Sequence, residues 1–445
     1  MNKFIEKFNE FSLLPAVIWN NIFFSYQELV DRYDQAMVFL GEQGIREGEV
    51  VALNGDFTPN TMALMFALIE NKNIIVPFNS NFKESESIKL DIAAVQKMIT
   101  VDVNTDKYNV ETKKGNGQHP LYELIRKNNH PGLVLFTSGT SGEPKGAVHD
   151  FSNLLEKFYI ARKSLRTVNF LLFDHWGGLN TMFHTLSNGG VVLTIKDRNP
   201  ESVCAFIEKH KIELLPASPT FLNLMLISEA YKNHDLSSLQ RITYGTEPMA
   251  SSTLEKLKKT FPGIKLQQTY GLIELGVLRS KSKSDDSLWV KVGGEGYELR
   301  VVNDLLEIKA ESAMLGYLNA PSPFTEDGWF MTGDQVEVDG EYLKILGRKS
   351  EIINVGGEKV YPQEVESVIQ EVENVAEVTV YGEKNAIIGN IVCAKVRLLK
   401  DEDPKMFASR LKTYCRQRMQ QYKVPVKVII SSEEQFSDRF KKKRA

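Results

Sequence analysis

The stretch LVLFTSGTSGEPKGAVHD, Leu133 to Asp150, joins an apolar strand to a loop of small polar residues that ends at Lys145. A flexible chain of Ser, Thr and Gly exposes successive backbone N–H groups and hydroxyls, which together suit phosphate oxygens, and the lysine adds a positive charge. It is not a GxxxxGK[ST] loop, because Lys145 stands between Pro144 and Gly146. We therefore predict a phosphate-binding loop of another kind; the alternative is a surface turn with an incidental lysine. The predicted loop consists of Thr137, Ser138, Gly139, Thr140, Ser141, Gly142 and Lys145.

Composition indicates an ordinary globular protein with local substrate recognition. The 445 residues suffice for two or three domains, and 54 basic against 57 acidic residues give a net charge of −3. This balance provides no global field for nucleic acid or anionic membrane, so neither is expected as a partner. The three cysteines are few and far apart, which fits a reducing compartment. Charges interrupt the N-terminal apolar residues and no run approaches a membrane span, so a cytoplasmic protein is expected.

Short β-branched runs alternate with helical patterns along most of the chain. EVVALNGDF, NIIVPFNS, GVVLTIKD and IELLPASPT are typical of strands, and PNTMALMFALIENK and ESVCAFIEKHK of helices. This alternation predicts the α/β class, with parallel-rich sheets covered by helices. After about residue 340 the pattern changes to strand, Gly-Gly turn, strand, capped helix and strand. We predict a large N-terminal domain, residues 1–349, and a small mobile C-terminal α+β domain, residues 350–445, with a hinge near Glu351.

Four motifs in fixed order resemble those of the adenylate-forming superfamily, which includes acyl-CoA synthetases, luciferases and the adenylation domains of peptide synthetases. TSGTSGEPKG resembles its signature loop, and YGLIELG at Tyr270 to Gly276 resembles its YGxTE motif. GYLNAPSPFTEDGWFMTGD at Gly316 to Asp334 and GRKSEIINVGGEKVYPQEVE at Gly347 to Glu366 complete the order. The resemblance covers nearly the whole chain. It implies that a carboxylic acid reacts with ATP to give an acyl-adenylate and pyrophosphate, and that the acyl group then passes to a thiol.

The resemblance assigns roles to individual residues. It implies that the loop embraces the β- and γ-phosphates, that Glu274 holds Mg²⁺, and that Lys441 of FSDRFKKKRA compensates charge during adenylation. Lys442 competes with Lys441 one position on, and a solvated basic tail is the simpler alternative. Further residues implied in nucleotide binding are Tyr270 and Gly271, Gly245, Thr246 and Glu247 beside the adenine, and Asp334 and Arg348 at the ribose. Taken singly, each has a structural alternative, such as a core aromatic for Tyr270.

The second half-reaction and the acid are less defined. Gly356 and Gly357 resemble the pantetheine tunnel of CoA ligases, which implies CoA or the phosphopantetheine of a separate carrier protein as acceptor; a tight hairpin turn is the alternative. The acid pocket is expected at LLFDHWGGLNTMFHTLSNGG, where two registers place either Asp174 or His175 at the family's histidine. An aspartate there resembles amino-acid-activating domains, and the alternative is a helix N-cap. The pocket candidates are Asp174, His175, Trp176 and Gly178.

Two departures from the family motifs keep a second class of function open. Ile273 replaces the threonine of YGxTE, which removes a hydroxyl, and Phe440 stands where glycine is usual before the lysine. The main prediction is an acid–thiol ligase that activates a small or medium carboxylic acid. The alternatives are a stand-alone amino-acid adenylation enzyme that loads a carrier protein, and a nucleotide-binding module without turnover.

Overall fold

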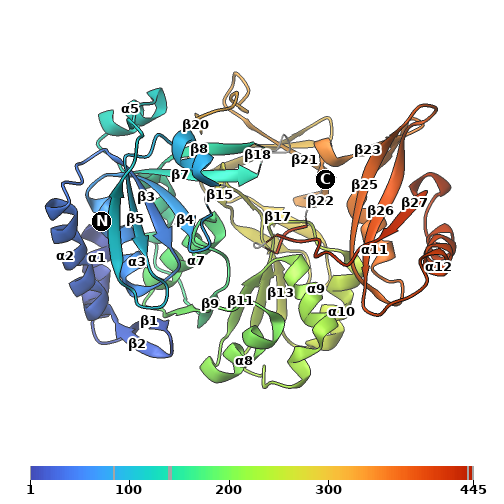
Figure 1. The fold of residues 1–445 in the computed structure, drawn as a ribbon, viewed down its shortest axis with the longest axis horizontal. Coiled ribbons are helices and arrows are strands. Elements are labelled where there is room, and N and C mark those ends of the chain that lie inside the picture. The colour runs from blue at the N-terminus through green and yellow to red at the C-terminus, as the bar shows by residue number, and fades with distance from the viewer. Residues whose placement is uncertain (1, 84–85, 139–142, 438–439, 443–445) are drawn as a thin grey trace.

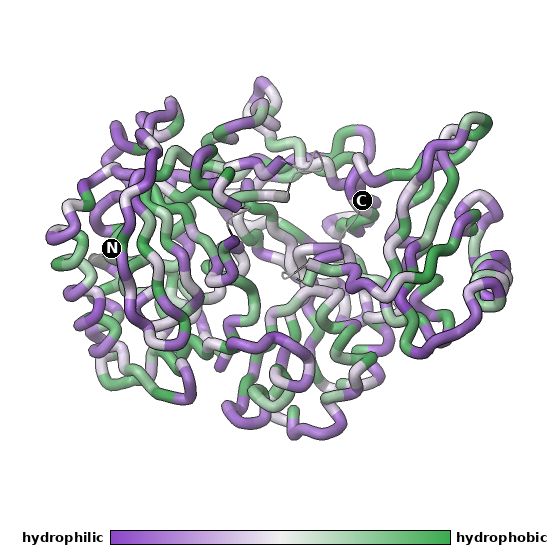
Figure 2. The backbone as a smooth tube through the Cα atoms, in the orientation of Figure 1, coloured by the Kyte–Doolittle hydropathy of each residue, from purple (hydrophilic) through white to green (hydrophobic). Residues whose placement is uncertain are grey.

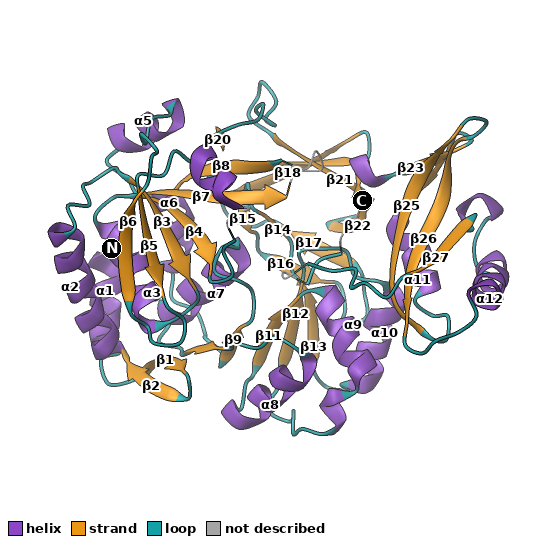
Figure 3. Ribbon diagram, in the orientation of Figure 1, coloured by secondary structure: helices purple, strands orange, loops and turns teal. Residues whose placement is uncertain are grey.

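The structure is a computed structural model that describes residues 2–83, 86–138, 143–437 and 440–442. Its two large sheets have parallel centres flanked by helices, as predicted (Figures 1 and 3). The first sheet has the order β20 (Gly316–Tyr317), β8 (Pro144–Asp150), β7 (Gly132–Ser138), β4 (Ile74–Asn79), β3 (Val50–Gly55), β5 (Lys97–Val101) and β6 (Tyr108–Thr112). The second has the order β13 (Lys265–Gln268), β12 (Arg241–Tyr244), β11 (Leu214–Ala217), β9 (Thr167–Asn169), β10 (Val192–Thr194), β1 (Pro15–Trp19) and β2 (Ile22–Ser25).

Helices of the first 349 residues cover these sheets. They are α1 (Asn2–Glu10), α2 (Tyr26–Glu42), α3 (Pro59–Glu70), α4 (Ser87–Ile92), α5 (Pro120–Lys127), α6 (Phe151–Leu155), α7 (Trp176–Leu186), α8 (Pro200–His210), α9 (Pro219–Ser228) and α10 (Ser251–Thr260). The sequence specifies α3 locally, because Thr58 caps its N-terminus through a hydrogen bond from the Thr61 amide and Pro59 occupies the first turn. Its apolar residues are buried between the α2 layer and the sheet. The predicted helices at residues 59–72 and 201–211 thus correspond to α3 and α8.

A third sheet is antiparallel throughout and was not predicted from the sequence. Its order is β16 (Ser280–Ser282), β17 (Trp289–Val292), β22 (Tyr342–Arg348), β21 (Phe330–Asp339), β19 (Leu305–Ala310) and β18 (Tyr297–Val302). A two-stranded ribbon, β14 (Gly271–Leu272) and β15 (Gly276–Val277), precedes it. Their apolar side chains form one cluster with Ala147 of β8 and Tyr270, so this sheet packs against the residues of the predicted site.

The C-terminal region has a separate sheet and its own core. The sheet contains β24 (Glu358–Val360), β23 (Ile353–Val355), β26 (Gly389–Leu398), β25 (Val375–Asn385) and β27 (Lys427–Ile430), and the helices are α11 (Pro362–Ile369) and α12 (Pro404–Arg416). Its buried cluster draws on residues 353–424 alone, and Figure 2 shows the hydrophobic strands at this end of the molecule. Separate cores agree with a boundary near residue 350, which stays a prediction.

The C-terminal region rests on the helices of the second sheet. Ser252 of α10 donates a hydrogen bond to the Ser367 carbonyl at 3.2 Å, and Gln363 of α11 donates to the Pro248 carbonyl at 3.3 Å. Figure 1 shows α9 and α10 beside α11, with β25, β26 and α12 beyond them. The chain after α12 returns from there to the second sheet. Lys441, the lysine predicted to act in adenylation, lies there beside His175 and Thr246.

Candidate active site

The predicted phosphate loop connects two strands of one hairpin. β7 and β8 are antiparallel, with Thr137 opposite Lys145. Gly139, Thr140, Ser141 and Gly142 lie outside the described residues. The Lys145 Nζ atom stands 5.7 Å from the ring centroid of Tyr317, which belongs to β20 on the far side of β8. The hairpin therefore fixes both ends of the loop and directs the lysine towards a neighbouring aromatic ring.

Glu274 lies in the turn between β14 and β15, beside that same ring. Its Oε1 atom accepts a hydrogen bond from the Tyr317 hydroxyl at 2.6 Å. Burial raises the pKa of Tyr317, and the nearby Glu274 charge raises it further, so the phenol stays a donor. Gly271 opens the ribbon where a Cβ atom would stand 2.9 Å from the Gly276 carbonyl oxygen. Glu274 and Lys145 thus share Tyr317, which the sequence analysis quoted in GYLNAP without a role.

Tyr270, Asp334 and Arg348 form a cluster at the two central strands of the third sheet, in which Tyr270 and Asp334 are buried and the Arg348 side chain is 44% exposed. The Tyr270 hydroxyl donates to Asp334 Oδ2 at 2.6 Å, and Arg348 Nε pairs with Asp334 Oδ1 at 2.8 Å. Asp334 and Arg348 are register partners on β21 and β22. Arg348 also donates to the Thr332 carbonyl at 2.7 Å, and the Thr332 hydroxyl accepts from the Asp334 amide at 3.0 Å. Three predicted nucleotide-binding residues are therefore in direct contact.

Burial has a strong influence on this cluster. It raises the pKa of Asp334 above its ordinary value, against the opposing effects of the Arg348 charge and the Tyr270 hydrogen bond. Burial and the Asp334 charge also raise the pKa of Tyr270 far above its ordinary value. The carboxylate of Asp334 is held in one orientation by its two partners. It supplies fixed acceptor oxygens of the kind that recognise a pair of hydroxyls.

Gly245, Thr246 and Glu247 follow the carboxyl end of β12, where ligands commonly bind in parallel sheets. A Cβ atom at Gly245 would lie 2.4 Å from the Thr269 hydroxyl, so only glycine fits. Thr246 has φ +73°, which is strained for a β-branched residue. Its hydroxyl oxygen is shielded from solvent and has no hydrogen-bond partner among the described residues. A strained backbone with a buried, unpaired hydroxyl points to a bound group at this position.

The N-terminus of α7 corrects one sequence prediction. His175, and not Asp174, is the N-cap, because its Nδ1 atom accepts from the Gly177 amide at 3.0 Å and its backbone is extended. Asp174 is buried and accepts a hydrogen bond from the Asn79 side chain at 3.0 Å. Trp176 is also buried, and Gly178 allows a close approach of the Leu172 carbonyl. The helix begins at Trp176, so the capping position falls on His175. Asp174 could cap only a helix that began one residue earlier.

Ile273, the departure from the YGxTE motif, has an apolar role. It is half-buried and packs against both the main core of the first sheet and the cluster under the third sheet. A threonine there would give up part of this packing for a hydroxyl. The substitution is consistent with a structural contribution from residue 273.

The C-terminal tail places its two lysines in different surroundings. Lys441 lines a small pocket together with His175 and Thr246. The Lys442 Nζ atom pairs with Glu366 of α11 at 2.7 Å, and that carboxylate is 1% exposed. The Lys442 amide also donates to Glu247 Oε2 at 3.2 Å, while Glu247 Oε1 accepts from the Thr220 amide at 2.8 Å. The geometry favours Lys441 over Lys442 as the lysine that faces the site; Arg444 lies outside the described residues.

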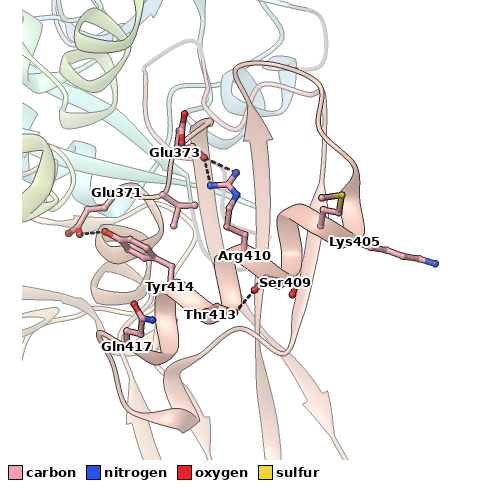
Figure 4. Close-up of a pocket in the computed structure, with 10 residues that line it drawn as sticks. Glu371, Glu373, Lys405, Ser409, Arg410, Thr413, Tyr414 and Gln417 are labelled. Carbon is pink, nitrogen blue, oxygen red and sulfur yellow. Dashed lines mark hydrogen bonds between the residues drawn. The ribbon is translucent and has the colours of Figure 1, made fainter.

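Two other features of the C-terminal region lie apart from these contacts. Gly356 and Gly357 form the turn between β23 and β24 with φ +58° and +93°, and no heavy atom lies within 4 Å of a Cβ built at either. The hairpin turn considered from the sequence is therefore present, with open space around it. A hollow on the outer side of α12 is bordered by internally paired side chains, such as Tyr414 with Glu371 (Figure 4). It contains none of the predicted site residues.

The fit of a metal rests on Glu274. Among the described residues there is no group of three or more His, Cys, Asp or Glu side chains that could hold a metal ion. Mg²⁺ in nucleotide enzymes needs no such cage, since one carboxylate with water and substrate phosphates completes its coordination. Glu274 is a hard oxygen donor that shares Tyr317 with Lys145, and it fits this mode of binding. Within the described chain, no helix is long and apolar enough to cross a membrane.

Comparisons with known proteins agree with this architecture. Residues 5–318 match the family described as AMP-binding enzyme, and residues 364–437 match the AMP-binding enzyme C-terminal domain. The 2-succinylbenzoate–CoA ligase of Listeria innocua is 27% identical over 91% of this chain and 90% of that protein. Indoleacetate–CoA ligase of Aromatoleum aromaticum is 30% identical over 68% of this chain and 64% of that protein.

Solved structures share the fold over nearly the entire chain. Anthranilate CoA ligase AuaEII in complex with anthranoyl-AMP superimposes with a TM-score of 0.82 and 20% identity, over 99% of this chain and 95% of that chain. The o-succinylbenzoate CoA synthetase of Bacillus subtilis, in complex with its acyl-adenylate intermediate, gives a TM-score of 0.79 and 21% identity, over 99% and 96%. At these identities the likeness shows the fold.

Proposed function

Because the chain belongs to the AMP-binding enzymes, we propose that it joins a small or medium carboxylic acid to coenzyme A through an acyl-adenylate. In the first step a carboxylate oxygen attacks the α-phosphorus of ATP and pyrophosphate leaves. In the second step the sulfur of CoA attacks the acyl carbon, AMP leaves and the thiol proton passes to solvent. The named relatives are CoA ligases, which favours CoA over a carrier protein as the acceptor.

The observation that carries this proposal is the convergence of three groups at one place in the fold. Tyr270, which contacts Asp334, follows the end of β13. Thr246 follows the end of the neighbouring β12, and the tail brings Lys441 to the pocket at Thr246. Lys441 comes from the C-terminal tail, whereas Tyr270 and Thr246 belong to the large domain. A ribose-type acceptor beside a lysine from a second domain is an arrangement suited to activating an acid on a nucleotide.

The charges of the site support the chemistry of the first step. A carboxylate and a triphosphate repel each other, so their reaction requires fixed positive charge and in-line positioning. We propose that Lys145 and the phosphate loop hold the leaving pyrophosphate, and that Lys441 compensates charge at the reacting α-phosphate. Glu274 would hold Mg²⁺, which supplies charge neutralisation on the phosphates when bound.

The position of Asp174 leads us to favour this function over amino-acid activation. Its buried carboxylate is hydrogen-bonded to Asn79, whereas the next residue, His175, lines the pocket with Thr246 and Lys441. An aspartate that recognises a substrate ammonium would be expected to line that pocket. We propose a carboxylic acid without an α-amino group as the substrate.

The test is pyrophosphate release with ATP and Mg²⁺ over a panel of fatty, aryl and amino acids, first without a thiol and then with CoA. We expect release with one class of non-amino acid, and formation of its thioester when CoA is added. Release confined to amino acids, without a CoA product, would refute the proposal in favour of carrier loading. ATP binding without pyrophosphate release on the entire panel would indicate the nucleotide-binding module that Ile273 and Phe440 raised.

A further inference from the structure

Phe440 occupies a backbone conformation that suits glycine. Its φ is +49°, in the left-handed region where a side chain adds strain. The sequence carries phenylalanine here although glycine is usual before the lysine in the resembled motif. A residue that strains its own backbone persists where the surrounding contacts compensate for it. The contacts of the ring therefore decide what Phe440 does.

The Phe440 ring inserts into an aromatic recess of the large domain. Its centroid lies 5.6 Å from that of Phe170 and 5.3 Å from that of Phe221, and these two rings are themselves 4.4 Å apart. Phe436 stacks on the outer side of Phe440 at 5.5 Å with an interplanar angle of 18°. Phe170 and Phe221 are buried members of the core of the second sheet, so the recess belongs to a rigid part of the molecule.

Backbone contacts fix the tail around this ring. The Ser218 hydroxyl, which also caps α9, donates to the Phe440 carbonyl at 2.7 Å. The Phe440 amide donates to the Ser437 carbonyl and the Ser437 amide to the Lys441 carbonyl, both at 2.8 Å. Ser437, Phe440 and Lys441 are thus linked through their backbones, and the ring, the Ser218 hydroxyl and the contact of the Lys442 amide with Glu247 attach them to the large domain.

This turn determines which lysine faces the site. With Phe440 seated against Phe170, the next residue, Lys441, lies at the pocket with His175. The following residue, Lys442, is directed to Glu366 on the C-terminal domain. A displacement of Phe440 would move Lys441 away from the pocket, because the Cα atoms of the two residues belong to one planar peptide unit and stay about 3.8 Å apart.

We propose that Phe440 is a positioning residue that anchors the tail in the aromatic recess and thereby holds Lys441 at the acid–nucleotide pocket for the adenylation step. The inference rests on the proposed function. The anchor joins the tail to the core of the second sheet, so it stabilises the domain arrangement described here. Loss of the ring should therefore slow adenylation selectively and leave thioester formation from a supplied acyl-adenylate nearly unchanged.

The variants separate the ring from the backbone strain. Phe440→Gly removes the ring and also relieves the backbone strain, because glycine adopts a positive φ easily. Phe440→Ala removes the ring and keeps the strain. Phe440→Leu keeps an apolar side chain that can occupy the recess. The matched control is Phe206→Ala, since Phe206 is a half-buried phenylalanine that packs against the same core but lies on α8 beside His210. Each variant is measured for pyrophosphate release and for thioester formation from supplied acyl-adenylate. Hydrogen exchange of the Ser437, Phe440 and Lys442 amides provides a readout independent of activity.

We expect Phe440→Gly to slow adenylation by about tenfold or more, from the loss of a partly buried aromatic side chain, and to accelerate exchange of the tail amides. Phe440→Leu should retain most of the adenylation rate and most of the protection of the tail amides from exchange. Phe206→Ala should change neither the ratio of the rates of the two half-reactions nor the exchange of the tail amides. Adenylation by Phe440→Gly at the wild-type rate, or an equal loss in both half-reactions, would overturn the proposal. If the wild type activates no acid, the proposed function fails, and unchanged tail exchange in Phe440→Gly would still refute the anchor.

Discussion

Two parts of the candidate site are stabilised in different ways. In the Tyr270–Asp334–Arg348 cluster, Tyr270 and Asp334 are buried, and Asp334 and Arg348 come from neighbouring strands in fixed register. Phe440, Lys441 and Lys442 instead reach the site from the C-terminal tail and contact both domains. The contacts of the cluster lie within residues 270–348, whereas the contacts of the tail join it to both Ser218 and Glu366. We therefore predict that substitutions in the cluster change mainly nucleotide affinity, and that substitutions in the tail change mainly one reaction step.

The largest effect is expected from the tail, with Lys441→Ala. Loss of a charge aimed at the reacting phosphate should slow pyrophosphate release by about 100- to 1,000-fold. Thioester formation from supplied acyl-adenylate should change less, because no carboxylate anion has to approach the phosphate in that step. Both rates are measured on the same preparation.

Lys442→Ala is the matched control for this prediction. Lys442 carries the same charge on the next residue but pairs with Glu366. Its loss should reduce adenylation far less than the loss of Lys441. If Lys442→Ala proves the more damaging change, or if Lys441→Ala lowers both half-reactions equally, the tail does not act on one step.

The second prediction concerns the buried region and uses pH. His149 lies on β8 with Lys145, is 1% exposed, and burial lowers its pKa from the usual 6.5 to about 4. Above pH 6.5 the ring is neutral in both the folded and unfolded chains. As the pH falls from 6.5 to 4, the unfolded chain binds a proton that the folded chain excludes. The free energy of unfolding should therefore fall by about 3 kcal/mol across this window because of His149.

His149→Gln separates this effect from other titrating groups. The variant should lose stability less steeply than the wild type between pH 6.5 and 4, as measured by urea unfolding. Parallel stability profiles for the two proteins would show that the ring is accessible to protons and that this strand is less rigidly buried than the cluster. The substitution should not change the contacts of the C-terminal tail. The hydrogen-exchange rate of the Phe440 amide, measured in both proteins, checks this.

The third prediction addresses the cluster itself through Tyr270→Phe. The hydrogen bond from the hydroxyl to the carboxylate of Asp334 involves a charged acceptor, so its loss should lower the free energy of unfolding by about 2 kcal/mol. ATP should bind more weakly, because Asp334 loses one of the two partners that orient it. Calorimetric titration with ATP measures the affinity. Tyr297→Phe is the control: its hydroxyl contacts Ser312 at 3.0 Å, and its removal should leave ATP affinity unchanged. Equal ATP affinities for wild type and Tyr270→Phe would exclude the cluster from nucleotide binding.

Local sequence patterns were sufficient for several helices and strands of the two large sheets, and the ordered motifs were sufficient for the class of enzyme. Residues 59–72 predicted α3, and residues 201–211 predicted α8. The comparisons confirm the adenylate-forming resemblance, the α/β fold and the ligase class. Helical periodicity, caps and glycine-rich motifs all act over a few residues, which is why they can be read without a structure.

These local patterns could not predict which residues far apart in the sequence contact each other. The antiparallel third sheet joins Trp289 to Lys344, and no periodicity within either strand specifies that partner. The sequence could not choose between Lys441 and Lys442, since the choice depends on Glu366, 76 residues away from Lys442. Tyr317 was missed although GYLNAP contains it, because its role appears only when β20 pairs with β8. The roles assigned to the individual site residues stay predictions until they are measured.

The smallest effect is expected at the β23–β24 turn of the C-terminal domain, with Gly357→Ala. The φ of +93° lies outside the range that alanine adopts easily, so the substitution should cost about 1 kcal/mol of stability. Gly356→Ala is the matched variant and should cost less, because its φ of +58° is close to the ordinary left-handed conformation. Neither new methyl group meets a neighbour within 4 Å, so differences between them report backbone strain.

These two variants also distinguish a hairpin turn from a passage for pantetheine. A methyl group that narrows such a passage should slow thioester formation from supplied acyl-adenylate and leave pyrophosphate release unchanged, the reverse of Lys441→Ala. We expect this reversed selectivity in Gly357→Ala. If both half-reactions slow equally, and only as much as the loss of stability explains, then Gly356 and Gly357 form a turn and do not line a passage for pantetheine. The C-terminal domain would then contribute to the reaction through its tail and not through this hairpin.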